Sequence, residues 1–139
     1  MPKDKRPISF LEKKLNFLAK IALKKLRKNR CSAPVFLLDG KKMAFLKLKY
    51  AKKKPRGLVD VLAFPEPAGF PPQRSGKTSL GEIYVNRETA KSDFERARFL
   101  VVHGLLHLLG FSHDKKTDIL LMEKEEKKLC RFLGIKTSF

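Results

Sequence analysis

Tryptophan is absent from this sequence of 139 residues, and only two cysteines, two tyrosines and three histidines occur in it. Cys31 and Cys130 lie far apart and belong to no paired metal or redox motif, so we interpret both as small buried side chains. The longest apolar stretch, residues 99–111, is shorter than the ~18 residues that a membrane-spanning helix needs. The N-terminus lacks the apolar segment and cleavage site of a secretory signal. We therefore expect a soluble, cytoplasmic protein with no membrane-spanning segment.

Acidic residues are also scarce, with 14 Asp and Glu against 32 Lys and Arg and a formal net charge of +18. The imbalance lies almost entirely in residues 1–56, which hold 19 Lys and Arg against three acids. Such a field favours a polyanionic partner, with nucleic acid or an anionic membrane surface as the candidates. The chain length and its 42% of apolar residues predict one domain, residues 1–139, with a core of its own.

The basic N-terminal segment, residues 1–30, has a helical pattern. From residue 9 to about residue 29, apolar side chains recur three and four positions apart, which predicts an amphipathic helix. Lysines and arginines occupy the complementary surface. Each of them alone is typical of a solvated face, but as a set we interpret them as a surface that faces phosphates.

Three short apolar runs rich in large or β-branched side chains predict strands. They are residues 34–38, 58–64 and 81–86. Residues 65–78 carry four prolines and two glycines and are predicted to form a surface loop. Helical periodicity recurs over residues 41–50 and 117–132. In the first of these two helices the side chains expected to point inward are Met43, Leu46 and Tyr50.

Residues 93–109 predict the central helix of the fold. Ser92 followed by Glu95 is a capping-box signature, and the residues after it are apolar on all sides, which is typical of a buried helix. Strands that alternate with helices predict an α/β or α+β fold. We expect a single small domain with a short mixed sheet and about four helices, in which the buried helix carries two metal-binding histidines.

All three histidines fall within eleven residues of one another, at His103, His107 and His113. His103 and His107 are spaced i and i+4, so in a helix their side chains lie on one face within reach of one ion. Gly110 is expected to end the helix as a left-handed cap, and the turn after it can bring His113 to the same point. Three histidines with an open fourth position are typical of a catalytic zinc site, although nickel, copper and iron also bind imidazole.

Gly104 occupies the place where zinc peptidases of the H-E-x-x-H type carry their general base. Without that glutamate a peptidase lacks its proton acceptor, so a proteolytic function is disfavoured. A bound metal can still activate a water molecule or stabilise charge on a phosphoryl oxygen. Together with the basic N-terminal half, this favours a phosphodiester substrate.

Several motifs carry a resemblance to a known family. The run HGLLHLLGFSH at residues 103–113, VDVLAFP at residues 59–65 and LGEI at residues 80–83 are similar to HGxLHLxGxDH, TDVLSFP and LGDI. Met122 with Glu126 is similar to a downstream M-x-x-x-E. With these motifs, roughly residues 34–135 resemble the YbeY endoribonucleases, bacterial zinc-dependent RNases that cut single strands.

The resemblance implies an α/β fold of the family's own type and one zinc ion on His103, His107 and His113. It also implies single-stranded RNA, ribosomal RNA and the ribosome as partners. The implied roles are maturation of the 3′ end of the small-subunit ribosomal RNA and ribosome quality control.

The chain departs from the family pattern at three places. Ser112 replaces the aspartate before the third histidine, and Asp114 follows that histidine. Glu82 replaces the aspartate of LGDI. The family's phosphate-holding arginine aligns with Lys53, or with Ala51 when two residues are inserted, which leaves Arg56 or the lysine run as substitutes.

We expect cleavage of RNA by an activated water or by the RNA's own 2′-hydroxyl. The catalytic candidates are Asp60, Lys53 and Arg56, and Asp60 either handles protons, orients a ligand histidine or caps a turn. Phe64 is either a core residue or part of a stacking surface for an unpaired base. Two alternatives stay open: a non-catalytic zinc-containing ribosome assembly factor that binds RNA, and a metallohydrolase with another substrate.

Overall fold

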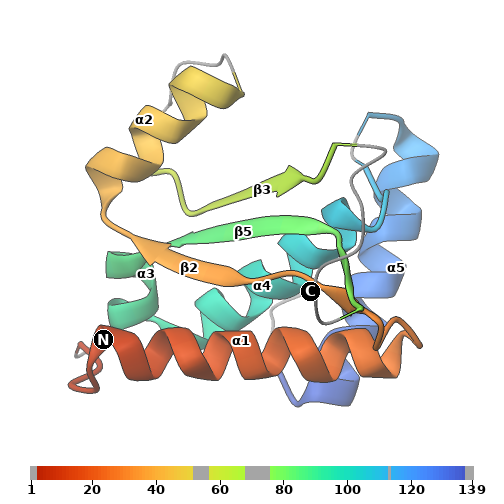
Figure 1. The fold of residues 1–139 in the computed structure, drawn as a ribbon, viewed down its shortest axis with the longest axis horizontal. Helices are drawn as coiled ribbons and strands as arrows, with labels where there is room; N and C mark the ends of the chain where they lie inside the picture. The colour runs from red at the N-terminus through yellow and green to blue at the C-terminus, as the bar shows by residue number, and fades with distance from the viewer. Residues whose placement is uncertain (1–2, 52–56, 68–75, 113, 137–139) are drawn as a thin grey trace.

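The computed structural model describes residues 3–51, 57–67, 76–112 and 114–136, and within these ranges the chain has an α+β fold with two small sheets (Figure 1). The larger sheet has the strand order β2 (Val35–Leu38), β5 (Gly81–Asn86) and β3 (Val61–Pro65). The central strand β5 is parallel to β2 and antiparallel to β3. The smaller sheet pairs β1 (Cys31–Ser32) with β4 (Thr78–Ser79) in parallel.

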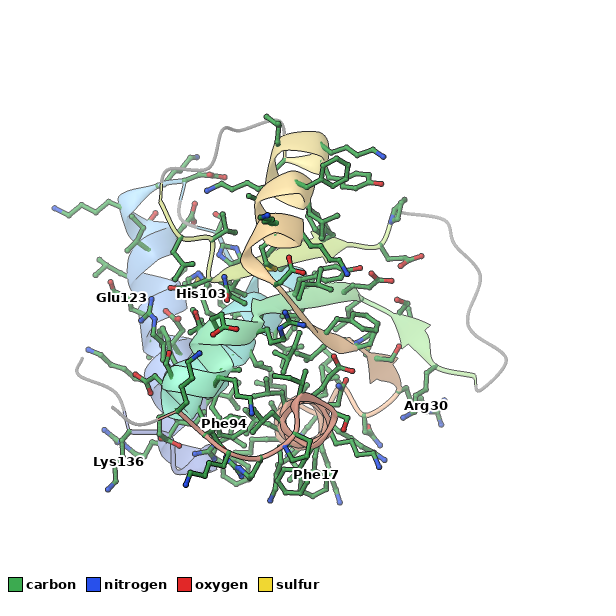
Figure 2. The ribbon with its side chains drawn as sticks, turned by 90° about the vertical axis from the view of Figure 1, so that its left-hand side faces the viewer. Phe17, Arg30, Phe94, His103, Glu123 and Lys136 are labelled. Atoms are coloured by element: carbon green, nitrogen blue, oxygen red, sulfur yellow. The ribbon has the colours of Figure 1, made fainter. Side chains whose placement is uncertain are left out.

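Five helices in the described ranges surround the larger sheet. They are α1 (Ile8–Lys25), α2 (Gly40–Tyr50), α3 (Arg87–Ser92), α4 (Phe94–Leu108) and α5 (Lys116–Leu133). Helices α1 and α4 pack together against the sheet, and α5 packs on α4. Helix α2 lies on the opposite side of the sheet from α1 in both ribbon views (Figures 1 and 2). None of the described helices is long and apolar enough to span a membrane.

The core lies between the sheet and the pair of helices α1 and α4. Alternate residues of β2 and β5 are buried there, namely Val35, Leu37, Ile83 and Val85. The apolar stripe of α1 meets them with Leu11, Leu15, Leu18 and Ala22, as its spacing predicted. Helix α4 contributes five side chains from its middle turns that are at most 4% exposed: Leu100, Val101, Val102, Leu105 and Leu106. The prediction that this helix is central to the fold is confirmed.

The predicted count of about four helices is wrong, because residues before the histidine helix form a separate short helix. The Asn86 side chain accepts hydrogen bonds from the backbone N–H of Glu88 (2.9 Å) and of Thr89 (3.4 Å), and so caps α3. The chain then turns, and the Asp93 side chain caps α4 by accepting from the Arg96 N–H at 3.1 Å. The predicted cap at Ser92 is therefore wrong by one residue.

Two further predictions need correction. The strand expected over residues 58–64 begins three residues later, at Val61, and Leu58 is 67% exposed to solvent instead of lying in the sheet. In α2, Met43 is buried as expected, but Tyr50 is 59% exposed. The expected loop over residues 65–78 lies largely outside the described residues; its two ends belong to β3 and β4.

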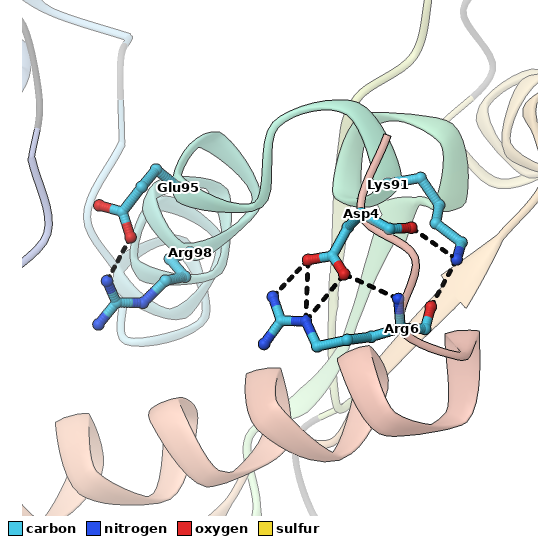
Figure 3. A network of polar contacts seen from close by, with 5 residues as sticks. All are labelled: Asp4, Arg6, Lys91, Glu95 and Arg98. Atoms are coloured by element: carbon cyan, nitrogen blue, oxygen red, sulfur yellow. Dashed lines mark hydrogen bonds and ion pairs between the residues drawn. The ribbon is translucent and has the colours of Figure 1, made fainter. Parts of the chain in front are cut away.

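A polar network ties the N-terminal residues to α3 (Figure 3). The Asp4 carboxylate accepts from the backbone N–H of Arg6 at 2.9 Å and from its Nε at 2.8 Å. Lys91 of α3 donates from Nζ to the Asp4 carbonyl at 2.9 Å and also to the Arg6 carbonyl. The hydrogen bonds from Arg6 lower the pKa of Asp4 from 3.8 to about 2.

We expect Asp4→Asn to lower the melting temperature by a few degrees at neutral pH, measured by circular dichroism. Because the pKa of Asp4 is lowered on folding, its carboxylate stabilises the fold above pH 3.8 and loses this effect as the pH falls toward about 2. The difference between variant and parent should therefore shrink in that window. Asp114→Asn, at an exposed aspartate, is the control and should leave the melting temperature unchanged. A difference that does not depend on pH would contradict the assignment.

Gly81 allows β3 and β5 to pair closely. Its φ is 132°, and a Cβ at this position would lie 2.1 Å from the Phe64 carbonyl oxygen and 2.8 Å from Pro65 Cα. We expect Gly81→Ala to lower the free energy of unfolding by about 3 kcal/mol or more in urea titrations. Gly76→Ala is the matched control, because Gly76 also has a positive φ, 78°, but no described atom lies within 4 Å of its Cβ position. That variant should cost only about 1 kcal/mol, and equal losses would contradict the backbone clash.

Candidate metal centre

His103 and His107 lie one turn apart on α4 with their rings facing each other, as their spacing predicted. Their Nε2 atoms are 3.2 Å apart, and the ring centroids are 4.7 Å apart at an interplanar angle of 75°. Both residues are half-buried, and 23% of the His103 side chain is exposed. Figure 2 shows His103 on the side of the molecule where α4 meets α5. The two imidazoles thus present neighbouring nitrogens at a place that solvent reaches.

Glu126 of α5 orients the His103 ring. Its Oε2 lies 2.8 Å from His103 Nδ1, and only 4% of the Glu126 side chain is exposed. Met122, one turn earlier on α5, is fully buried and fixes the same face of the helix against the core. When Nδ1–H donates to the carboxylate, Nε2 of His103 keeps its lone pair and points it toward His107.

This geometry fits a metal ion. Two nitrogen ligands of one tetrahedral zinc lie about 3.3 Å apart, given Zn–N distances of about 2.0–2.1 Å. The observed separation of the two Nε2 atoms is 3.2 Å. A carboxylate that accepts the other ring N–H is also the usual partner of a metal-binding histidine. Both the spacing and the support of His103 are therefore those expected of metal ligands.

The third predicted ligand, His113, lies outside the described residues. Among the residues that the structure does describe, no group of three or more His, Cys, Asp and Glu side chains is arranged to hold a metal ion. The three-histidine site and its zinc ion thus stay predictions. Gly110, which was expected to end the helix, has a φ of 103° and donates its N–H to the His107 carbonyl at 3.0 Å.

Gly104 lies at the contact between α4 and the sheet. A Cβ there would meet Ile83 Cγ2 at 3.1 Å and Ala63 Cβ at 3.7 Å, and Ile83 is fully buried. A glutamate at this position would have to point into the sheet instead of toward the histidines. Packing therefore also favours glycine at this position, because even a Cβ would require Ile83 to shift.

Asp60 has other partners than the histidines. Its Oδ1 accepts from Thr89 Oγ1 at 2.7 Å, and its Oδ2 lies 3.0 Å from Arg96 Nη2 and 3.3 Å from Nε. Asp60 therefore connects the start of β3 with α3 and α4. The contact that orients a ligand histidine, for which Asp60 was one candidate, comes from Glu126.

The two basic catalytic candidates, Lys53 and Arg56, lie outside the described residues. Ser112, in the place of the family's aspartate, donates from Oγ to Asp118 Oδ2 at 3.3 Å, which attaches the turn after α4 to the first turn of α5. Asp114 is exposed.

The cysteines differ in burial. Cys130, one turn after Glu126, is buried, and this burial, with the nearby Glu126 carboxylate, raises the pKa of its thiol to about 11. It is therefore a protonated side chain of the core near neutral pH. Cys31 was also expected to be buried, but it is only half-buried at the start of β1.

The role of Glu126 was not recognised from the sequence. The M-x-x-x-E pattern pointed to Met122 and Glu126 only through the resemblance. A second signal was present: an amphipathic helix that places a carboxylate on its apolar side, one turn from a buried methionine, because buried carboxylates need a partner.

Known proteins are similar to this chain over most of its length. A family model described as "Endoribonuclease YbeY" matches residues 3–134. The protein named Endoribonuclease YbeY from Thermodesulfovibrio yellowstonii is 32% identical over 141 residues, covering 91% of this chain and 86% of its own. Its namesake from a Wolbachia of Drosophila simulans is 30% identical over 145 residues, covering 94% and 91%. A solution structure from Thermotoga maritima aligns with 96% of this chain and 89% of its own at a TM-score of 0.49 and 22% identity. With a family model over nearly its whole length and relatives of at least 30% identity, this chain belongs to the endoribonuclease YbeY family.

Proposed function

We propose that this chain is a zinc-dependent endoribonuclease that cuts single-stranded RNA, with one ion held by His103, His107 and His113. The observation that carries the proposal is the pair of Nε2 atoms 3.2 Å apart on α4, with the buried Glu126 carboxylate behind one of them. The printed names of the relatives support RNA as the substrate, and so does the net charge of +18.

A zinc ion at this place supplies Lewis-acid chemistry, which stabilises the charge that develops on the oxygens of a phosphodiester. The side chains of the protein prepare its ligand atoms. When the Nδ1–H of His103 donates to Glu126, Nε2 of the same ring keeps its lone pair for the ion. The close packing of α4 on β5 at Gly104 fixes the helix, and with it the relative position of the two rings. Lys53 or Arg56 neutralises the phosphate.

The proposed substrate in the cell is ribosomal RNA, on the ribosome and in the cytoplasm. Maturation of the 3′ end of the small-subunit RNA and ribosome quality control are the proposed processes. Membership of the family supports this, and the basic N-terminal half suits a large folded polyanion.

His107→Ala tests the enzyme against a non-catalytic assembly factor. We expect the variant to stay folded and to bind a single-stranded RNA oligonucleotide with unchanged affinity, but to cut it at least about 100-fold more slowly, since even loss of an outer partner costs ~10–100-fold. Gel assays measure cleavage and fluorescence anisotropy measures binding. Ser9→Ala, at an exposed residue of α1, is the control and should cut at the parental rate. Equal cleavage by His107→Ala would refute the assignment of this histidine.

Glu126→Gln tests the support of His103. The amide keeps the shape of the side chain but removes the charge behind the Nδ1–H, so we expect zinc affinity to fall by about 10–100-fold. Competition with a chromophoric chelator measures the affinity. Glu123→Gln is the matched control, because Glu123 lies on the same helix but is exposed, and it should bind zinc as the parent does. Equal affinities of the two variants would show that Glu126 does not support the ligand.

A further inference from the structure

The face of the larger sheet that points away from α1 and α4 carries a row of aromatic rings. Alternation along the strands places Phe36 and Tyr84 on this face, since their neighbours Val35, Ile83 and Val85 are buried in the core. Phe36 and Tyr84 are also directly opposite each other in the β2–β5 pairing. Their rings are stacked, with centroids 5.4 Å apart at 27°.

The row continues across β3 to the end of α2. The Phe64 ring lies 5.8 Å from that of Tyr84 and 6.0 Å from that of Tyr50, in both cases edge to face. Four rings from three strands and one helix are thus in continuous contact: Phe36, Tyr84, Phe64 and Tyr50. The last ring is 59% exposed, so the row ends in solvent and not beneath another element that the structure describes.

The charge beside this aromatic row suits an anion. Helix α2 carries four lysines and no acidic residue, the lysines being Lys41, Lys42, Lys47 and Lys49. Lys49 Nζ lies 5.3 Å from the Tyr50 centroid and 5.5 Å from that of Phe45, which is itself 58% exposed. Glu82, on the same face, accepts the Tyr84 hydroxyl. Burial and this hydrogen bond raise the pKa of Tyr84 to about 12, so its hydroxyl stays protonated as the donor.

We propose that Tyr50, Phe64, Tyr84 and Phe36 form a base-stacking surface for single-stranded RNA, with the α2 lysines neutralising its phosphates. The proposal rests on the proposed function for the identity of the RNA, which is the strand that the histidine site cuts. Aromatic rings interleaved with cations bind unpaired bases without sequence preference, because every base has a π face. Lys42 lies near the Asp39 carboxylate, but an apolar protein partner would offer no counter-charge to the other lysines of α2, so the observations favour the polyanion.

The protein has only two tyrosines and no tryptophan, and both tyrosines belong to the aromatic row. Its intrinsic fluorescence therefore reports on this surface alone. We expect oligouridylate to quench the tyrosine emission, and the same oligonucleotide paired with oligoadenylate to quench it far less, because its bases are already stacked. The titration uses the full chain with His107→Ala, so that the RNA is not cut while it is measured.

Tyr50→Leu in the same background keeps an apolar side chain but removes the exposed ring. We expect it to weaken oligouridylate binding about tenfold by anisotropy. Phe17→Leu is the matched control: Phe17 is 62% exposed on α1, across the sheet from α2 (Figure 2), and its replacement should not change the affinity.

The outcomes separate this proposal from the nuclease. If oligouridylate binds without quenching, and Tyr50→Leu and Phe17→Leu bind it equally well, the stacking surface is wrong, while cleavage by the unsubstituted chain still supports the enzyme. If oligouridylate quenches the tyrosine emission and Tyr50→Leu binds it tenfold more weakly, but the unsubstituted chain cuts no RNA, the stacking surface is supported and the nuclease function is refuted. Absence of any binding to oligouridylate overturns the stacking surface.

Discussion

The approach of α4 to the central strand of the sheet is the constraint on which the candidate site depends. A Cβ at Gly104 would lie 3.1 Å from Ile83 Cγ2, a tight contact, and the residues around Gly104 in α4 are buried. The helix therefore cannot slide or rotate without opening the core, which interiors packed to crystal-like density resist. His103 and His107, on the neighbouring face of the same turns, inherit this rigidity. Their two Nε2 atoms are therefore held 3.2 Å apart by the packing of the helix that carries them.

The same packing also buries Glu126 next to His103, where each side chain provides the hydrogen-bond partner that the other needs. A carboxylate that is 4% exposed is costly unless it is hydrogen-bonded, and so is the ring nitrogen of a half-buried histidine. Each satisfies the other at 2.8 Å, which ties α5 to α4 at the site. The fold and the ligand geometry are thus coupled: a change that lets α5 move also frees the His103 ring. This explains why a residue of the last helix belongs to the same site as a histidine 23 residues earlier in the chain.

The sequence pattern predicted those features that depend on residues close together in the chain. The strands at residues 34–38 and 81–86 alternate between a buried and an open face, and three histidines in eleven residues needed a common explanation. The short helix α3 was missed because its sequence, RETAKS, has no apolar stripe and it depends on the cap from Asn86. The Glu126–His103 contact and the exposure of Tyr50 depend on how α5 and α2 dock, and no spacing within either helix encodes that. The packing of the helices against one another and against the sheet therefore determined the Glu126–His103 contact and the exposure of Tyr50, which the sequence pattern did not predict.

The basic residues of α1 and those of α2 lie on different sides of the molecule. The sheet separates them, since α1 and α2 lie on opposite sides in both ribbon views (Figures 1 and 2). A few unpaired nucleotides that lie along the aromatic row contact the lysines of α2 and leave those of α1 free for other phosphates. A large folded RNA can reach both sides, and counterion release then makes its binding much tighter and more salt-dependent than that of a short strand. The distribution of charge, more than its total, therefore favours a substrate in which a short single strand emerges from a larger structured RNA.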